Sequence, residues 1–155
     1  MQLISPTPEA ILSAALHLKN GGLVAIPTET VYGLGADAEN PSAIQKIYFA
    51  KNRPSNHPLI VHVAEISDVY HFADRVPAYA EALMQKFWPG PMTLILPRTN
   101  RSADFVTGGQ DSVGLRIPDH QIGLKLLASF KALGGHGIAA VSYTHLRAHE
   151  TKANL

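Results

Sequence analysis

Five short apolar runs alternate with amphipathic segments along this chain, and this alternation constrains the fold more than any other feature. The runs lie at residues 23–27, 58–63, 92–97, 113–118 and 137–142, and glycine or proline bounds each of them on at least one side. Apolar runs of this length and punctuation predict buried strands, whereas apolar residues three and four apart in the intervening segments predict helices. The alternation therefore favours an α/β fold, a sheet layered with helices.

Five segments between the predicted strands have helical spacing and plausible ends. In the first, Ser5 or Thr7 is expected to cap the helix, and Gly21 and Gly22 to end it; in the last, Asp119 is expected as the cap. No repeat or linker interrupts the 155 residues, so we expect one domain. The helical segments are residues 5–22, 41–53, 67–74, 77–88 and 119–135.

The composition limits the partners and the compartment. The formal net charge is only +1, so affinity for polyanions must come from a local cluster of basic residues. Without cysteine the chain forms neither disulfides nor thiolate metal sites. With no apparent signal peptide and no apolar run near ~18 residues, we expect a cytoplasmic protein that does not enter membranes. His145 and His149 have helical metal-ligand spacing but no third ligand nearby, so we expect no metal held by side chains.

The loop PTETVYGLG, directly after the first predicted strand, is rich in hydroxyl groups and glycine. Thr28, Thr30 and Tyr32 offer hydroxyls, while Gly33 and Gly35 permit close approach of a ligand to the backbone. The spacing is neither that of a phosphate-binding P-loop nor that of a dinucleotide fingerprint. A turn with its caps and a ligand-binding loop remain equally compatible with these residues.

A basic stretch, KNRPSNHPLIVHV, joins a predicted helix to the second predicted strand. Lys51 and Arg53 stand two residues apart, so the pair suits a polyphosphate, with lysine as a point charge and arginine as a bidentate donor. The competing interpretation is a solvated helix end whose basic residues complement the helix dipole. His62, within the apolar strand, is more typical of a hydrogen-bonded core histidine than of a ligand.

A third candidate is Arg116, because it lies inside an apolar strand where an unpaired guanidinium would be costly to bury. Either a carboxylate of the protein or the anion of a ligand must pair with it. Ser112 stands four residues earlier and is expected on the same face of the strand. The stretch WPGP at residues 88–91 is interpreted as a structural turn into a core strand.

Together, these stretches resemble one known family. The motifs PTETVYGLGADA, KNRPSNHPLIVHV, WPGPMTLIL, TGGQDSVGLRIP and GIAA stand in the order seen in the YrdC-like family, the threonylcarbamoyl-AMP synthases. The resemblance runs from about the first helix to Ala140. It implies a twisted mixed sheet with surrounding helices and a concave, positively charged cavity.

The resemblance also implies a reaction. L-threonine and bicarbonate form a carboxylated amine, which attacks the α-phosphate of ATP with the help of Mg²⁺; the products are threonylcarbamoyl-AMP and pyrophosphate. A complex of tRNA-modification proteins then transfers the threonylcarbamoyl group to an adenosine of tRNA. No residue is assigned as a catalytic acid, base or nucleophile, because positioning and charge neutralisation supply most of what nucleotidyl transfer needs from a protein.

Site residues follow from the resemblance by matching motifs. Four positions match the L-threonine site and five match the ATP site. The threonine positions are Thr30, His62, Arg116 and Ala140, and the nucleotide positions are Lys51, Arg53, His57, Ser112 and Ser142.

After GIAA the chain departs from the family pattern, since Val141 stands in place of a proline and Tyr143-Thr144 in place of Ala-Asn. We therefore expect an incomplete YrdC-like domain at residues 1–140 and a foreign or frameshifted tail at 141–155. Such a chain is expected to keep the threonine side of the cavity and to bind ATP weakly. Two other functions remain open, an RNA-binding module and a family paralogue with another substrate, although the near-neutral charge does not favour the first and the lack of cysteine argues against a zinc-bearing paralogue.

Overall fold

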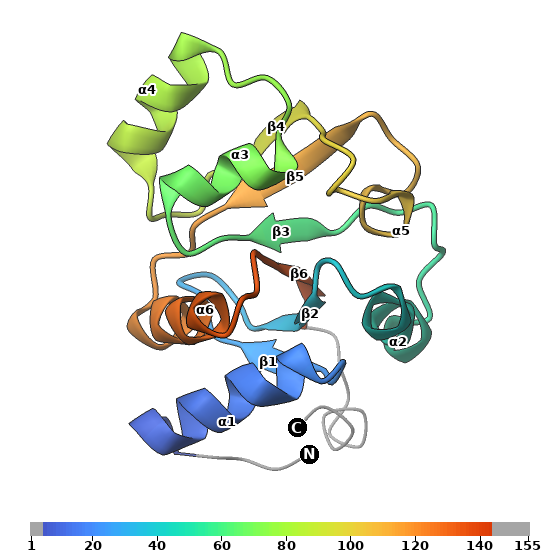
Figure 1. Cartoon of the computed structure of the whole chain (residues 1–155), viewed down its shortest axis with the longest axis vertical. Coiled ribbons are helices and arrows are strands. Elements are labelled where there is room, and N and C mark those ends of the chain that lie inside the picture. Colours follow the sequence, from blue (N-terminus) through green and yellow to red (C-terminus); the bar gives the residue numbers. More distant parts are fainter. Residues whose placement is uncertain (1–4, 144–155) are drawn as a thin grey trace.

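A six-stranded mixed sheet forms the centre of the molecule in the computed structural model, which describes residues 5–143. The strand order is β1-β2-β6-β3-β5-β4, and only β3 and β5 run parallel to each other. Figure 1 shows helices at both sides of this sheet. The strands are β1 (Val24–Ile26), β2 (Gly33–Asp37), β3 (Ile60–His62), β4 (Leu94–Pro97), β5 (Ser112–Arg116) and β6 (Ile138–Ser142).

Each of the five expected helical segments contains a helix, and the short helix α5 was not predicted. Thr7 caps α1, as its side chain accepts a hydrogen bond from the backbone N–H of Ala10 at 3.2 Å. For α6 the predicted cap was wrong: His120 has the extended backbone of a cap, and its Nδ1 accepts from the backbone of the first turn. The helices are α1 (Pro8–Lys19), α2 (Pro41–Lys51), a 3₁₀ turn η1 (Ile66–Asp68), α3 (Val69–Phe72), α4 (Ala78–Phe87), α5 (Asp104–Thr107) and α6 (Gln121–Ala132).

Strand β2 was not predicted, because its glycines were interpreted as part of a loop that either turns the chain or binds a ligand. Glycine is unfavourable in strands, but all five residues of β2 are buried between β1 and β6. A Cβ on Gly35 would lie 2.5 Å from Ile26 Cδ1 and 2.8 Å from Ile138 Cγ2. Gly35 is therefore needed for packing across the sheet, and not for a ligand or a turn.

Two apolar clusters cover the two faces of the sheet. Ile138 belongs to a smaller cluster with α1 and α6, whereas its neighbour Ala139 belongs to the larger cluster with α2, α3 and α4. Successive residues of a strand point to opposite faces, so the clusters lie on opposite sides of β6. Figure 1 shows α1 and α6 side by side near β1.

Strand β6 continues through Val141 and Ser142, two residues beyond the predicted domain boundary, and both pair with β2. Tyr143 donates its backbone N–H to the carbonyl oxygen of Tyr32 at 2.8 Å. Residues 144–155, including His145 and His149, lie outside the described residues, so the boundary stays a prediction. Within residues 5–143, no helix has the length and apolar character that crossing a membrane requires.

Candidate functional site

The strand pairing places predicted site residues on one face of the sheet. Gly33 pairs with Ser142 and Ile60 with Ala140, in antiparallel ladders. His62 pairs with Arg116 across the parallel ladder of β3 and β5. Paired residues share a face, and residues two apart along a strand also share it. All six of these residues therefore face the side of the sheet that carries the α1–α6 cluster: Gly33, Ile60, His62, Arg116, Ala140 and Ser142.

These six residues form the floor of a cavity of about 280 Å³. Gly33 and Ala140 hollow the floor because they carry little or no side chain. The walls come mainly from two loops, one after β1 and one before β3, and Val141 of β6 adds to them. The wall residues are Thr28, Val31, Tyr32, Arg53, Pro58 and Val141. Among the described lining residues are two guanidinium groups and no carboxylate, in agreement with the predicted concave, basic cavity.

A larger cavity of about 600 Å³ lies between α1, β1 and the start of α6 and shares Tyr32 with the first. Its described lining is mostly apolar and includes no Lys, Arg, Asp or Glu. Ligand sites are recognised by polar groups that converge on an otherwise apolar hollow. We therefore place the candidate site in the smaller cavity.

Arg116 is only 8% exposed, and its guanidinium is held from two sides. Nε donates to the carbonyl oxygen of Gly90 at 2.9 Å, and a terminal nitrogen forms an ion pair with Glu29. Burial lowers the pKa of Arg116, yet a guanidinium stays charged at neutral pH. The turn at Trp88–Pro91 thus orients Arg116 in addition to leading into β4. Of the two partners that the sequence left open for Arg116, a protein carboxylate or a ligand anion, the structure shows the carboxylate.

His62 is 6% exposed, and it is neutral at physiological pH, because burial lowers its pKa to about 4. Its Nδ1 atom is buried and has no hydrogen-bond partner among the described residues. A buried polar atom without a partner is rare in folded proteins. On the floor of a cavity, such an atom is suited to a hydrogen bond with a bound ligand.

The basic loop before β3 is fixed by its neighbours. The hydroxyl of Tyr48 bonds the carbonyl oxygens of His57 at 2.8 Å and of Phe105 at 3.1 Å. Arg53 donates through a terminal nitrogen to the carbonyl oxygen of Pro58 at 3.1 Å, while its Nε is buried without a partner in the described part of the chain. One guanidinium edge of Arg53 therefore remains available at the cavity wall.

The loop after β1 is organised by Thr28. Its hydroxyl accepts hydrogen bonds from the backbone N–H groups of Thr30 at 3.3 Å and Val31 at 3.2 Å, and it also bonds the carbonyl of Val31. This local turn directs Thr28, Val31 and Tyr32 to the cavity, while Glu29 reaches Arg116. The loop is therefore both a turn and a cavity wall, which were the two interpretations left open by its sequence.

Five of the nine predicted site residues line the cavity: Arg53, His62, Arg116, Ala140 and Ser142. Four do not belong to its described lining: Thr30, Lys51, His57 and Ser112. Ser112 shares the face of Arg116, as predicted from the period of two, but it pairs with Pro97 at the far end of β5. The roles of these four residues in binding a nucleotide or threonine stay predictions.

The sequence did not identify Glu29 as the partner of Arg116, or Thr28 as the residue that organises the loop after β1. The signal for Glu29 was the buried arginine itself, since burial of a guanidinium requires a carboxylate or a ligand anion. The signal for Thr28 was its position three residues before Val31, the spacing of a hydroxyl that closes a turn.

Comparison with known proteins shows the family of this chain. The profile of the Sua5, YciO and YrdC proteins, described as "Telomere recombination", matches residues 17–147. The chain belongs to this family. The resemblance seen in its motifs is thereby confirmed, and so is the predicted mixed sheet with surrounding helices.

Members of the family with assigned names are similar over most of this chain. Threonylcarbamoyl-AMP synthase from Bacillus subtilis is 47% identical over 125 residues, which are 80% of this chain and 36% of the relative. The corresponding enzyme from Halorhodospira halophila is 37% identical over 123 residues, 79% of this chain and 64% of the relative. The chain thus spans about a third of the length of the B. subtilis relative and of the Pyrococcus abyssi relative, of which it covers 34%.

A solved structure of the family superimposes closely. The crystal structure of P. abyssi Sua5 complexed with L-threonine has a TM-score of 0.83 with this chain and is 42% identical. The match covers 91% of this chain and 40% of that protein.

Proposed function

We propose that this chain binds L-threonine in the cavity formed by β2, β3, β5 and β6, and that it serves the synthesis of threonylcarbamoyl-AMP. The observation that carries the proposal is the convergence of Arg116, a neutral His62 and the small Ala140 on one floor, in a fold whose relative was crystallised with L-threonine. The guanidinium suits the amino-acid carboxylate, His62 Nδ1 suits a polar atom of the ligand, and Ala140 leaves room for a methyl group.

Arg116 is paired with Glu29 in the structure, so a substrate carboxylate must share or displace this partner. Sharing is possible because a guanidinium has five N–H donors, of which the contacts to Gly90 and Glu29 use only part. The pair keeps Arg116 charged and oriented before the substrate arrives.

ATP is proposed as the second substrate. Arg53 lines the same cavity, with Lys51 two residues away at the end of α2, so both are proposed to bind phosphate oxygens. On the same face of the sheet as Arg116, Gly114 is flanked by Ile60 and Ile95, two exposed apolar side chains against which a nucleobase is proposed to pack. His57, Ser112 and Ser142 are further proposed nucleotide contacts.

Mg²⁺ is proposed to enter with the triphosphate. The described cavity lining contains no carboxylate, and Mg²⁺ prefers oxygen ligands, so phosphate oxygens and water would hold it. Lys51 and Arg53 would neutralise the remaining phosphate charge.

The proposed reaction proceeds in two steps, carbamate formation and transfer of the adenylyl group. The amine of L-threonine and bicarbonate form a carbamate and water; a carbamate oxygen then bonds to the α-phosphorus of ATP as the bond to pyrophosphate breaks. Arg53 and Arg116 bring two anions together by neutralising both, which is the principal electrostatic task of such a site. The proposed setting is the cytoplasm, in the modification of tRNA together with partner proteins.

Pyrophosphate release from ATP tests the proposal. Release that requires both L-threonine and bicarbonate would support it. Release that needs neither, or RNA binding without release, would instead favour a paralogue with another substrate or an RNA-binding module.

A further inference from the structure

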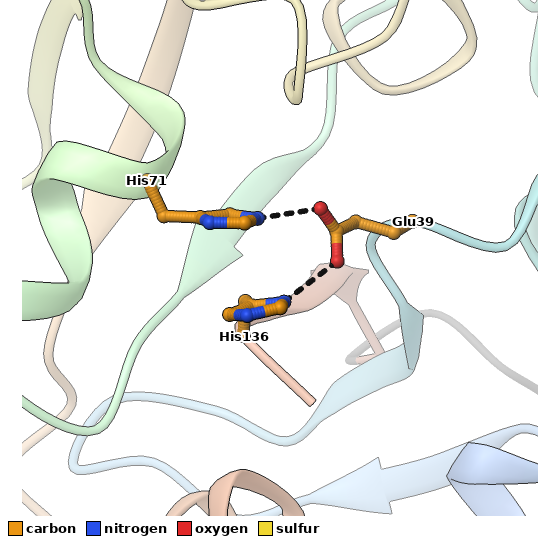
Figure 2. A group of neighbouring side chains, drawn as sticks. All are labelled: Glu39, His71 and His136. Carbon is orange, nitrogen blue, oxygen red and sulfur yellow. Dashed lines mark hydrogen bonds and ion pairs between the residues drawn. The ribbon is translucent and has the colours of Figure 1, made fainter. Parts of the chain in front are cut away.

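A second group of side chains lies at the opposite end of the β2–β6 pair from the cavity. Glu39 follows β2 by two residues, His136 precedes β6 by two residues, and His71 lies on α3. Gly33 and Ser142, at the other ends of these strands, belong to the cavity. One ligand atom from each of the three side chains lies within 4.8 Å of the other two. Figure 2 shows both imidazoles directed at the Glu39 carboxylate.

The geometry of this cluster is close. His71 Nε2 lies 2.6 Å from one carboxylate oxygen of Glu39, and His136 Nδ1 lies 2.8 Å from the other. The two imidazole rings stack with centroids 3.7 Å apart and an interplanar angle of 12°. Two imidazole nitrogens and one carboxylate oxygen form a donor set that suits zinc and related divalent transition metals.

The backbone at each of the three residues is held independently of the cluster. The N–H of Glu39 donates to Asp37 Oδ1 at 3.0 Å, and the carbonyl of His71 accepts from Thr99 Oγ1 at 2.8 Å. Next to His136, a Cβ on Gly137 would lie 2.7 Å from Val61 Cγ1, so only glycine allows this close approach to the core. Donors that are positioned before an ion binds lose little freedom when it does.

The charge state and the exposure also suit a cation. A glutamate carboxylate is ionised at neutral pH, and a histidine binds a metal through a neutral ring nitrogen. The side chains are 27% exposed for Glu39, 20% for His71 and 43% for His136. An ion can therefore reach the group from solvent, and water can complete its coordination.

We propose that Glu39, His71 and His136 bind one divalent transition-metal ion of the zinc class. The ion takes one nitrogen from each histidine and one or both oxygens of the carboxylate, in place of the two direct hydrogen bonds. It crosslinks α3, the β2–α2 connection and the α6–β6 connection, which are distant in the sequence. The site is separate from the cavity and from any Mg²⁺ that accompanies ATP, so it stabilises the fold whether or not the proposed reaction occurs.

Metal titration of the full chain, after removal of metal with a chelator, tests this site. His145 and His149 are replaced by alanine in the parent protein of all measurements, so that imidazoles of the tail cannot contribute. Zn²⁺ is titrated by calorimetry, and Co²⁺ by its visible absorption, which reports the ligand geometry. The expected result is one ion per chain with a dissociation constant in the micromolar range or lower, and a higher melting temperature with Zn²⁺.

Three variants of this parent assign the ion to the cluster. His136→Ala and Glu39→Gln are expected to weaken Zn²⁺ binding roughly 100-fold or more and to abolish the rise in melting temperature. His17→Ala removes an exposed histidine on α1 and is expected to change neither. Glu39→Gln can still form hydrogen bonds with both histidines, and urea unfolding without metal checks that each variant is folded. Absence of binding in the parent, or unchanged binding in His136→Ala and Glu39→Gln, would show a purely hydrogen-bonded cluster and overturn the proposal.

Discussion

Replacement of Arg116 by glutamine is the perturbation that separates ligand binding from fold stability. The substitution removes the ion pair with Glu29 and the hydrogen bond to the carbonyl of Gly90. Removal of one partner of a buried pair costs about 3–5 kcal/mol. Because the Glu29 side chain is 20% exposed and also accepts from the backbone of Asp119, we expect a smaller loss here, about 2–3 kcal/mol of unfolding free energy.

The expected effect on ligand binding follows from the contact that is lost. A hydrogen bond to a charged group contributes about 1.5–3 kcal/mol, so L-threonine should bind roughly 10- to 150-fold more weakly to Arg116→Gln. Isothermal titration measures the affinity, and urea unfolding measures the stability of the same samples.

Arg98→Gln is a matched control. Arg98 also pairs with a carboxylate, that of Asp104, and with a backbone carbonyl, that of Ser102, but it does not belong to the described lining of the cavity. We expect a loss of stability without a change in threonine affinity. If Arg116→Gln stayed folded and bound L-threonine within threefold of the parent, the placement of the substrate carboxylate at Arg116 would be wrong.

Three further predictions concern the histidine of the cavity, the loop after β1 and the packing of β2. Burial lowers the pKa of His62 from 6.5 in the unfolded chain to about 4 in the folded chain, so the folded state has its full stability above pH 6.5 and loses part of it as the pH falls to about 4. Urea unfolding at several pH values should show a loss of roughly 3 kcal/mol in the parent and no such loss in His62→Asn. Thr28→Val should weaken L-threonine binding at least about tenfold and Thr30→Val less than about threefold, as titration would show, whereas the reverse order would favour the assignment made from sequence. Gly35→Val should destabilise the fold by about 1–3 kcal/mol or more, because its side chain would overlap Ile26; an unchanged urea midpoint would refute this packing argument.

Most elements of the fold were predictable from hydrophobic period and punctuation. Helices such as α2 have apolar residues at helical spacing and a proline at the start, so their position needs only local information. Strand β2 was not predictable in this way. Its two glycines carry the local signal of a loop, and only the close packing against Ile26 and Ile138 makes them suitable for a strand.

The cavity was predictable only in part, because the sequence shows its residue types but not how its strands pair. Arg116 and His62 are recognisable as polar residues in apolar strands, and the order of the family motifs assigned both to one site. Their pairing across β3 and β5 is a matter of register, which the spacing along the chain does not fix. The same holds for Glu29, which lies 87 positions before Arg116 and joins it only when the loop after β1 folds over the sheet.

The cluster at the other end of β2 and β6 carried no sequence signal at all. Glu39 lies 32 positions from His71 and 97 positions from His136, so no ligand spacing connects them. The sequence accordingly suggested no metal held by side chains. The three residues meet because the connection after β2, the helix α3 and the connection before β6 come together in space (Figure 2).

A crystal structure of this chain with L-threonine tests the central claim most directly. The account predicts the amino acid in the cavity of about 280 Å³, with its carboxylate within hydrogen-bond distance of Arg116 and a polar atom at His62 Nδ1. L-threonine seated instead in the larger apolar cavity, or no bound L-threonine at saturating concentration, would contradict it.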